Sequence, residues 1–431
     1  MTTISQPVFD FLKTIAWRGV QPGLERMQRA LAALGNPQKS LRVIHIAGTN
    51  GKGSVCTLTA ELLAMSGYSV GLSLSPHIHD WRERIQYYPP PHPNPLPALG
   101  HPPPKGGGQG EGMAHFISEN DLLHTHQTLL TQLGSDMGLT YFEWSILLAL
   151  SYFSAQKFDF VVLETGLGGR WDATNVCDSF LSGIVTVGLD HMAILGDTLS
   201  KILSEKQCVI KADSDFLFGP TDSQLTAQVH EYCVSVGARF HTQAELQLTP
   251  AEQARVEKLF LHKPSYYKNN FLFVLALARI LQTRGIRLSV DSFLAVEIPL
   301  FPPARCEQIS TQPLIVIDGA HNEPALNVLK SFAEQEWHDV YDLVFGCLND
   351  RNVMHLASLI LPQSGAIYWA QFLADARGPS RKDYHQAQVQ WGGDIVFLDE
   401  RLKKQLQETS KPVLVCGSLY LCAQFNDFWR T

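Results

Sequence analysis

Hydrophobic residues follow two alternating patterns along this chain. Short apolar runs are typical of buried strands, and longer stretches with an apolar residue every three or four positions are typical of helices. The first 40 residues show the helical pattern, with Leu24, Met27 and Leu31 on one face, and Gly35 ends the segment. Beyond them, the patterns predict strands at 41–47, 70–74, 160–163, 183–187 and 216–219, and helices at 121–133, 141–155, 198–208 and 267–283.

A second series of the same kind follows a proline-rich stretch at 296–303, where prolines end both neighbouring elements. It predicts strands at 314–317, 341–345, 366–370 and 413–416. Because 431 residues are too many for one ordinary core, we expect two domains, 1–297 and 298–431.

The alternation breaks once, between residues 88 and 112. Pro89–Gly112 holds nine prolines and six glycines and almost nothing apolar, so it can neither fill a core nor form a helix or strand. We interpret 88–112 as a dispensable insertion between two strands of a hairpin. A docking segment in polyproline conformation is the alternative.

Composition narrows the class of protein. The net charge of −7 argues against bulk nucleic-acid binding, and the longest apolar run, Phe271–Ala278, is too short to span a membrane. Eight cysteines show no CxxC pair or zinc spacing, and the polar N-terminus does not resemble a signal peptide. We therefore expect a cytoplasmic protein that binds small molecules, without nucleic-acid or membrane partners.

One glycine-rich loop indicates nucleotide chemistry. The strand at 41–47 leads into Gly48-Thr49-Asn50-Gly51-Lys52-Gly53-Ser54, and an apolar helix follows. Small residues let backbone N–H groups approach an anion, the helix N-terminus attracts it, lysine adds a positive charge, and serine can hold Mg²⁺. The loop departs from GxxxxGK[ST] because Gly53 separates Lys52 from Ser54. The expected fold is α/β, with a P-loop mononucleotide-binding parallel-sheet domain followed by a smaller Rossmann-like α/β domain.

Other polar residues follow the ends of predicted strands, which is the edge where open α/β sheets bind ligands. Glu164 could be a Mg²⁺ ligand beside the loop, with Ser54 and Ser75 completing the shell, or it could form a salt bridge to Arg170. Asp190-His191 could be a second metal site or a helix cap. Lys206 could be an ordinary surface charge, Asp318 a helix cap, and His321 a polar residue of the core. Periodicity alone does not decide between these interpretations and a functional role.

Several motifs, taken in order, resemble folylpolyglutamate synthase, including its bifunctional dihydrofolate synthase form, within the Mur ligase superfamily. The resemblance covers nearly the whole chain apart from 88–112. It is carried by Gly48–Ser54, Ser75-Pro76-His77, Tyr141-Phe142-Glu143, Leu163-Glu164-Thr165-Gly166-Leu167-Gly168-Gly169-Arg170-Trp171-Asp172-Ala173-Thr174-Asn175, Asp190-His191, Glu205-Lys206, Asp318-Gly319-Ala320-His321-Asn322 and Gly417-Ser418-Leu419-Tyr420.

The resemblance implies a set of site residues. Gly48, Thr49, Asn50, Gly51, Lys52, Gly53 and Ser54 would bind the ATP phosphates, and Asn270, Arg305 and Asp318 would contact the nucleotide. One Mg²⁺ would be held by Ser54, Ser75 and Glu164, and a second by His191, Glu164 and a carbamylated Lys206. The pteroate would face Thr140, Tyr141, Phe142, Gly169, Arg170 and Trp171. The residues with catalytic roles would be Lys52, Lys206, Asp318, His321 and Ser418, the last two near the acyl-transfer and glutamate region.

The chain departs from the family pattern at four places. Gln207-Cys208 replaces Ala-Gly after the lysine, and Ala304 replaces the glycine before Arg305. Asn349-Asp350-Arg351 stands for Asp-Lys-Asp. Tyr266-Tyr267 replaces the His-Gln that precedes the adenine asparagine, which leaves a choice between Asn269 and Asn270, with Asn270 preferred.

The implied reaction is ATP-dependent ligation of L-glutamate to dihydropteroate, to folates or to both, through an acyl phosphate. The expected protein is a monomer, as family members often are. Two rival functions remain: another Mur-type amino-acid amide ligase, or a P-loop ATPase that is not a ligase. The Mur-type ligases that act on nucleotide sugars carry a separate N-terminal domain, for which this sequence leaves no room before Gly48. A P-loop ATPase that is not a ligase would not need His191, Lys206, Asp318 and His321.

Overall fold

The computed structural model describes residues 5–89, 114–296, 301–372 and 381–430. The chain divides into two compact units. The first contains residues 1–253 and 270–300, and the second contains 254–269 and 301–431. The predicted domain boundary at 297/298 lies outside the described residues. The predicted first domain, 1–297, includes residues 254–269, whereas this segment packs with the second unit.

The first unit is built on an eight-stranded sheet in the order β4-β3-β2-β5-β1-β6-β7-β8. Its strands are β1 Val43–Ala47, β2 Val70–Ser73, β3 Gln86–Tyr88, β4 His115–Phe116, β5 Phe160–Glu164, β6 Ser179–Ile184, β7 Asp215–Phe218 and β8 Arg239–Thr242. All neighbours from β2 to β8 run parallel, and β3 and β4 add an antiparallel edge. Central strands β1 and β5 are buried on both faces, which explains their continuous apolar runs.

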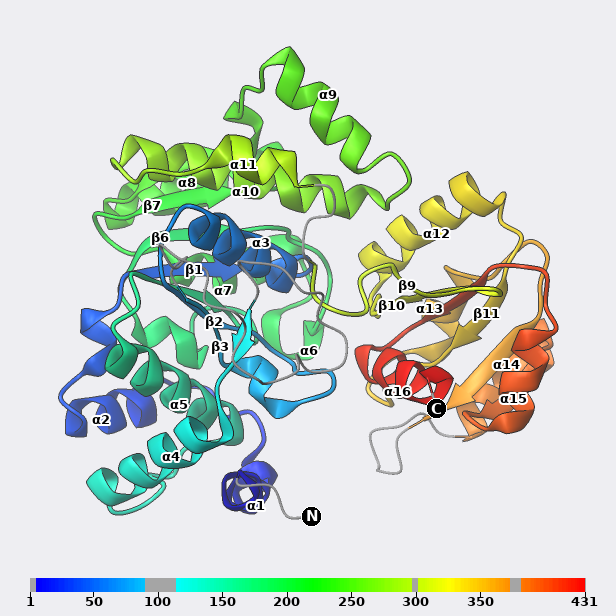
Figure 1. Cartoon of the computed structure of the whole chain (residues 1–431), viewed down its shortest axis with the longest axis horizontal. Helices are drawn as coiled ribbons and strands as arrows, with labels where there is room; N and C mark the ends of the chain where they lie inside the picture. Colours follow the sequence, from blue (N-terminus) through cyan, green and yellow to red (C-terminus); the bar gives the residue numbers. More distant parts are fainter. Residues whose placement is uncertain (1–4, 90–113, 297–300, 373–380, 431) are drawn as a thin grey trace, which may run out of the picture. The chain divides into compact units, whose positions relative to one another are not determined.

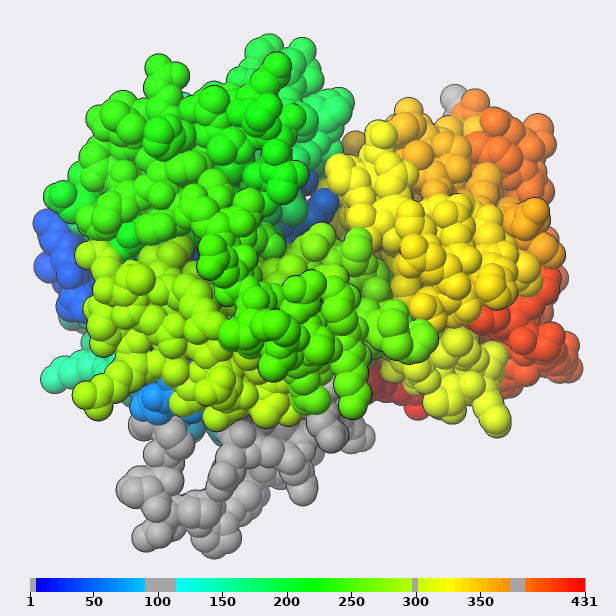
Figure 2. Space-filling model, turned by 90° about the horizontal axis from the view of Figure 1, so that it is seen from above, coloured from blue at the N-terminus to red at the C-terminus, as the bar shows by residue number. Residues whose placement is uncertain are grey.

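Helices cover both faces of this sheet (Figure 1). One face carries α3 Lys52–Met65, α10 Ser265–Thr283 and α11 Val290–Ala295, and the last two form the yellow-green part of the surface in Figure 2. The other face carries α1 Gln6–Ile15, α2 Glu25–Ala33, α4 Glu119–Leu133 and α5 Tyr141–Gln156. The unit also contains α6 Met192–Leu195, α7 Leu199–Lys206 and α8 Ser223–Val236. Helix α9 Pro250–Leu259 begins in the first unit and belongs to the second from residue 254 onward.

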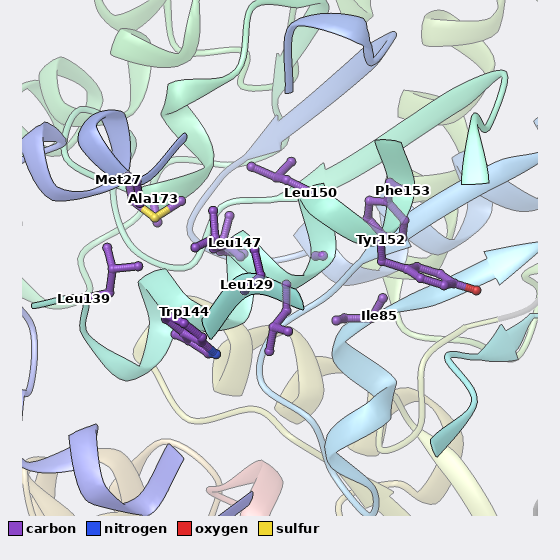
Figure 3. Close-up of a cluster of buried hydrophobic side chains, with 14 of the residues drawn as sticks. Met27, Ile85, Leu129, Leu139, Trp144, Leu147, Leu150, Tyr152, Phe153 and Ala173 are labelled. Carbon is purple, nitrogen blue, oxygen red and sulfur yellow. The ribbon is translucent and has the colours of Figure 1, made fainter. Parts of the chain in front are cut away.

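The larger core lies between α5 and the sheet. Figure 3 shows Trp144, Leu147, Leu150 and Phe153 of α5 among side chains from other segments of the chain, which include Met27, Ile85, Leu129, Leu139 and Ala173. Apolar residues surround α5 on nearly all sides, so the helix is buried rather than amphipathic. Shortening one of these leucines to alanine would cost about 2–5 kcal/mol. This core fixes the N-terminus of α5, which carries three of the predicted substrate residues.

The predicted hairpin around the proline-rich insertion is confirmed by the strands on either side of it. Tyr87 of β3 pairs with His115 of β4, so the two strands lie side by side where the insertion begins and ends. The insertion itself lies outside the described residues.

Because the hairpin ends are adjacent, replacing residues 90–113 with a four-residue turn should keep the fold and the activity. A shorter loop has a smaller closure entropy, so the free energy of unfolding should change by only about 1 kcal/mol. Thermal denaturation and the ligase assay would measure the two effects. A folded deletion variant without activity would refute dispensability and favour the docking segment.

The second unit contains a six-stranded sheet in the order β13-β12-β11-β14-β10-β9. Its strands are β9 Glu307–Thr311, β10 Leu314–Asp318, β11 Asp342–Phe345, β12 Ile367–Gln371, β13 Asp394–Phe397 and β14 Val413–Cys416. All pairs are parallel except β9 with β10. The helices are α12 Glu323–Trp337, α13 Val353–Ser358, α14 Arg381–Trp391, α15 Glu400–Gln407 and α16 Leu419–Arg430. The α/β class with parallel-dominated sheets is therefore confirmed.

One strand was predicted with the wrong bounds. The strand expected at 183–187 is β6 Ser179–Ile184, and Val185–Gly188 continues from its end and hydrogen-bonds to the end of β1 and to the glycine-rich loop. The sequence also gave no prediction for β8, β9 and β13. These three strands lie at or beside sheet edges, where the residues are partly exposed and the apolar pattern is weak.

Candidate active site

The glycine-rich loop connects β1 to α3, as predicted, and its shape requires glycine at Gly51. This residue has φ of 84°, and an added Cβ would lie 2.5 Å from Oδ1 of Asn270. The segment after β6 braces the loop: the amide of Asn50 donates to Thr186 Oγ1 at 2.8 Å, and the Gly188 amide donates to Thr49 Oγ1 at 3.0 Å. The loop is thus held in one conformation at the carboxyl edge of the sheet.

Two lysines meet at one carbonyl of this loop. Nζ of Lys52 and Nζ of Lys206 each donate to the Gly48 carbonyl at 3.0 Å. Lys206 is only 3% exposed, so the prediction of a plain surface charge is wrong. Burial first, and the charge of Lys52 second, lower the pKa of Lys206 to about 7, while Asp190 and Asp172 oppose that shift. Lys206 is therefore a buried amine with an unusually large neutral fraction at neutral pH.

Glu164 ends β5 directly beside the loop. Its Oε2 accepts the Ser75 amide at 2.9 Å and lies 3.5 Å from the position of a Cβ on Gly53. The alternative salt bridge from Glu164 to Arg170 is not formed, because Arg170 Nε pairs with Glu205 Oε1 at 3.0 Å. Glu164 therefore faces the phosphate loop and the segment after β2, as the metal interpretation requires.

The environment of the Ser54 hydroxyl indicates that a ligand binds beside it. Ser54 is 1% exposed, and among the described residues its Oγ finds no hydrogen-bond partner. A buried hydroxyl without a partner is costly unless something else satisfies it. A Mg²⁺ ion beside Ser54 and Glu164 would do so, since Mg²⁺ binds few protein oxygens together with substrate phosphates and water. Among the described residues, no three His, Cys, Asp or Glu side chains form a cluster that could hold a metal ion.

His191 is the residue that precedes α6. It has φ of 48°, and its Nε2 lies 3.9 Å from Oδ1 of Asp190. The Asp190 carboxylate accepts the His191 amide at 2.8 Å, and no side-chain hydrogen bond caps α6. A left-handed conformation at histidine is strained, so this turn is held by its surroundings.

The loop after Glu164 is tied to α7 through Gly169. An added Cβ on Gly169 would lie 2.8 Å from the carbonyl oxygens of both Glu205 and Lys206. The Arg170 amide also donates to the Glu205 carbonyl at 2.9 Å. Gly169 thus allows the close approach that fixes the C-terminal end of α7, where Lys206 lies.

The variant Gly169→Ala should therefore displace Lys206. We expect ligase activity to fall by about tenfold to a hundredfold, as for residues that orient a metal-site ligand. The steady-state rate at saturating substrates would measure the loss, and circular dichroism would check folding. Full activity in Gly169→Ala would contradict a close contact with α7.

The predicted pteroate residues lie at the start of α5 and on the loop after β5. Thr140 caps α5, with Glu143 completing the capping box, and Arg26 pairs with Glu143 at 2.9 Å. Phe142 packs against Gly166, and Tyr141 accepts a hydrogen bond from Trp81 Nε1 at 2.8 Å. Trp171 is half exposed.

Asn270 lies in the first unit beside Gly51. It is 3% exposed, and its Nδ2 has no hydrogen-bond partner among the described residues. Asn269, the other candidate, is exposed. The buried, unpaired amide favours Asn270 as the residue that meets a ligand.

In the second unit, the register brings the predicted residues to one sheet edge. Asp318 pairs with Cys416, so Asp318 and Ser418 follow neighbouring strand ends, and the Gly417 amide donates to the Ala320 carbonyl at 2.9 Å. Asp318 does not cap α12, because Asn322 does. His321 is partly exposed, and its Nδ1 lies 2.7 Å from the Gly319 carbonyl.

Sequence reasoning missed some residues that shape the site. The buried Asp172 accepts hydrogen bonds from the amides of Gly166 and Leu167 at 2.8 Å and from Thr174 Oγ1, which also contacts His45. Burial raises the pKa of Asp172, and these donors oppose that shift. Asp172 lies within the motif at 163–175, so the sequence shows its position but not its hydrogen bonds.

The fold and the phosphate loop define a class: two-unit ATP-dependent ligases of the Mur type. Comparison with known proteins narrows this class. No family model matches the chain. The chain is 28% identical to dihydrofolate synthase/folylpolyglutamate synthase of Bacillus subtilis, with 95% of each chain covered. It is also 28% identical to folylpolyglutamate synthase of Lacticaseibacillus casei, over 96% of this chain and 97% of that one.

Solved structures that are similar to this chain carry the same names as these sequence relatives. A bifunctional folylpolyglutamate synthase/dihydrofolate synthase from Yersinia pestis, crystallised with AMPPNP and Mn, matches with TM-score 0.79 and 26% identity, covering 100% and 99% of the two chains. Over nearly its whole length, the chain is therefore similar to proteins named folylpolyglutamate synthase and dihydrofolate synthase, as its motifs predicted. Within the described residues, no helix combines the length and the apolar character that a membrane span needs.

Proposed function

We propose that this protein joins L-glutamate to dihydropteroate, to folates or to both, at the expense of ATP. The observation that carries this proposal is the cluster of Lys52, Lys206, Ser54 and Glu164 around one glycine-rich loop. A relative of this fold has been crystallised with Mn, AMPPNP and L-glutamate; it is 25% identical with TM-score 0.78. ATP and a divalent metal are the cofactors that this cluster suits.

In the proposed reaction, a carboxylate oxygen of the acceptor attacks the γ-phosphorus of ATP. The bond to the bridging oxygen of ADP breaks, and an acyl phosphate forms. The amine of L-glutamate then attacks the acyl carbon, phosphate leaves, and the amine loses a proton to give the amide. Lys52 and the loop amides hold the phosphates in place, so the protein contributes mostly positioning and charge stabilisation.

In this proposal, two Mg²⁺ ions would bind, one held by Ser54, Ser75 and Glu164 and one by His191, Glu164 and Lys206. Such ions neutralise charge on the phosphates being transferred. Lysine can join this set only after carbamylation, in which the neutral amine adds to CO₂ and loses a proton. The lowered pKa of Lys206 supports that step, because it supplies neutral amine. Carbamylation would also replace one of two adjacent positive charges with a negative one.

The other predicted residues keep their proposed roles. Asn270, Arg305 and Asp318 would bind the nucleotide, and His321 and Ser418 would serve glutamate and acyl transfer. Thr140, Tyr141, Phe142, Gly169, Arg170 and Trp171 would face the pteroate. The proposal includes a cytoplasmic monomer, which size-exclusion chromatography with light scattering would test.

An ADP-release assay with each acceptor would test the function. We expect ADP release only when ATP, Mg²⁺, glutamate and either dihydropteroate or a folate are all present, with the amide product seen by mass spectrometry. ATP turnover without glutamate and acceptor would indicate a P-loop ATPase that is not a ligase. Turnover with a different amino acid and acceptor would indicate another Mur-type amide ligase.

A further inference from the structure

The first turn of α10 contributes two tyrosines to the second unit. Tyr266 and Tyr267 stack with their ring centroids 5.0 Å apart, and both belong to the segment 254–269 that packs with that unit. The hydroxyl of Tyr266 donates to Oδ2 of Asp318 at 2.6 Å. The hydroxyl of Tyr267 donates to the carbonyl of Arg305. One tyrosine thus contacts each of the two residues assigned to the nucleotide in this unit.

Asp318 is held from three directions. Besides Tyr266, its carboxylate accepts the amides of Cys306 and Ala320, both at 2.8 Å. Asp318 is 3% exposed, so water cannot easily replace a lost donor. The hydroxyl is the side-chain donor in this set, and a short contact to a carboxylate is among the stronger hydrogen bonds.

The same carboxylate shapes the backbone around Arg305. The residues on both sides of it, Ala304 and Cys306, have positive φ of 55° and 43°, which is strained for residues with a Cβ. The Cys306 amide is bound to Asp318, and the Ala304 carbonyl accepts the Gly319 amide at 2.8 Å. A shift of Asp318 would therefore release one restraint on the loop that carries Arg305.

We propose that Tyr266 is a positioning residue for nucleotide binding, which acts by holding Asp318 and, through it, the loop of Arg305. This inference rests on the proposed function, in which Asp318 and Arg305 contact the nucleotide. Tyr266 stands where the family pattern has histidine, so this chain fixes the aspartate with a phenol.

The pH dependence of ADP binding is a second measurement, and it depends on the charged and titratable groups around Asp318. Burial raises the pKa of Asp318, while Tyr266, the charge of Arg305 and the two backbone amides oppose the rise. The other neighbours are Tyr267, Cys306, Cys416 and Cys422, thiols and a phenol whose own pKa values burial raises, so they stay neutral near pH 7. Without the Tyr266 hydroxyl, Asp318 should take up its proton at higher pH.

The test is ADP binding to the full chain by isothermal titration calorimetry. In Tyr266→Phe we expect about tenfold weaker ADP binding at neutral pH, the effect of losing one hydrogen bond to a charged group. The loss of affinity on acidification should also begin at higher pH than in the unmodified protein. Tyr341→Phe is the matched control, because its buried hydroxyl, in the same unit, donates to the Ile360 carbonyl. Tyr341→Phe should bind ADP unchanged, and melting curves should show both variants folded.

The variant Asp318→Asn and the double variant separate this inference from the proposed function. If Tyr266 acts through Asp318, the double variant should bind ADP no more weakly than Asp318→Asn alone. Additive losses, or unchanged binding in Tyr266→Phe while Asp318→Asn binds weakly, would overturn the inference and leave the function standing. Unchanged binding in Asp318→Asn would overturn the nucleotide assignment of Asp318, and the inference with it.

Discussion

Replacing Lys206 with alanine is expected to lower the rate of ligation by about 10²–10³-fold, the usual loss when a group that stabilises charge in the transition state is removed. Added bicarbonate should not restore the rate, because the variant has no amine to carbamylate. The ligase assay with and without bicarbonate would measure both. Full activity in Lys206→Ala would end the carbamate proposal.

The physical reason is the position of the Lys206 amine. It is buried and shares the Gly48 carbonyl with Lys52, so two ammonium groups would lie side by side in a poorly solvated place. With its pKa lowered to about 7, Lys206 has a substantial neutral fraction at pH 7, whereas an ordinary lysine is almost wholly charged. Intact-mass measurement in CO₂-rich buffer should detect the added CO₂ in the unmodified protein and not in Lys206→Ala.

Lys201 provides the matched control for this experiment. It lies on the same helix, α7, but its side chain is 64% exposed and pairs with Asp197 at 2.8 Å. Lys201→Ala removes the same charge from the chain without touching the phosphate loop. We expect it to keep its activity, and a loss comparable with that of Lys206→Ala would assign the effect to net charge or to helix stability.

Replacing Glu164 with glutamine is expected to lower the rate by about 10²-fold and to raise the Mg²⁺ concentration needed for half-maximal activity. Glutamine has nearly the same volume and can still accept the Ser75 amide, so the fold should persist. What it lacks is the negative charge that a hard cation requires. Rates measured over a Mg²⁺ titration would separate weaker metal binding from slower chemistry.

Asp159→Asn is the control for Glu164→Gln. Asp159 immediately precedes β5, at the opposite end of the same strand from Glu164, and its carboxylate accepts the amide and the hydroxyl of Ser69 at 2.7 Å. The Mg²⁺ dependence of Asp159→Asn should match that of the unmodified protein. An unchanged Mg²⁺ dependence in Glu164→Gln would remove Glu164 from the metal shell.

Much of the fold could be predicted from apolar periodicity. The buried strands β1 and β5 form continuous apolar runs because both faces of the sheet are covered by helices. Prediction failed where the local sequence pattern of a segment did not match its position in the folded protein. Val185 and Val187 extend the apolar pattern of β6, yet the segment Val185–Gly188 lies beyond the strand and hydrogen-bonds to the phosphate loop. The segment 254–269 precedes the linker in the sequence, yet it packs with the second unit.

The candidate site could be predicted in part. Residues of the phosphate loop and the strand ends were visible as motifs, because their chemistry requires particular residue types at close spacing. Lys206 was indistinguishable from a surface lysine by its periodicity, and only the resemblance gave it a role. Roles for Tyr266 and Asp172 were not predicted. Tyr266 contacts Asp318, which lies 52 residues further along the chain, and Asp172 accepts hydrogen bonds from a loop whose fold the residue pattern does not record.

The sequence by itself determined the α/β alternation, the glycine-rich loop and the resemblance to folylpolyglutamate synthases, since these depend on residue type and order over short stretches. The tertiary structure decided the environment of each charged group. It buried Lys206 beside Lys52, turned Glu164 toward Ser75 rather than Arg170, and brought Tyr266 to Asp318. The reason is that a pKa or an ion pair depends on desolvation and on distances between segments far apart in the chain, which neither composition nor periodicity records.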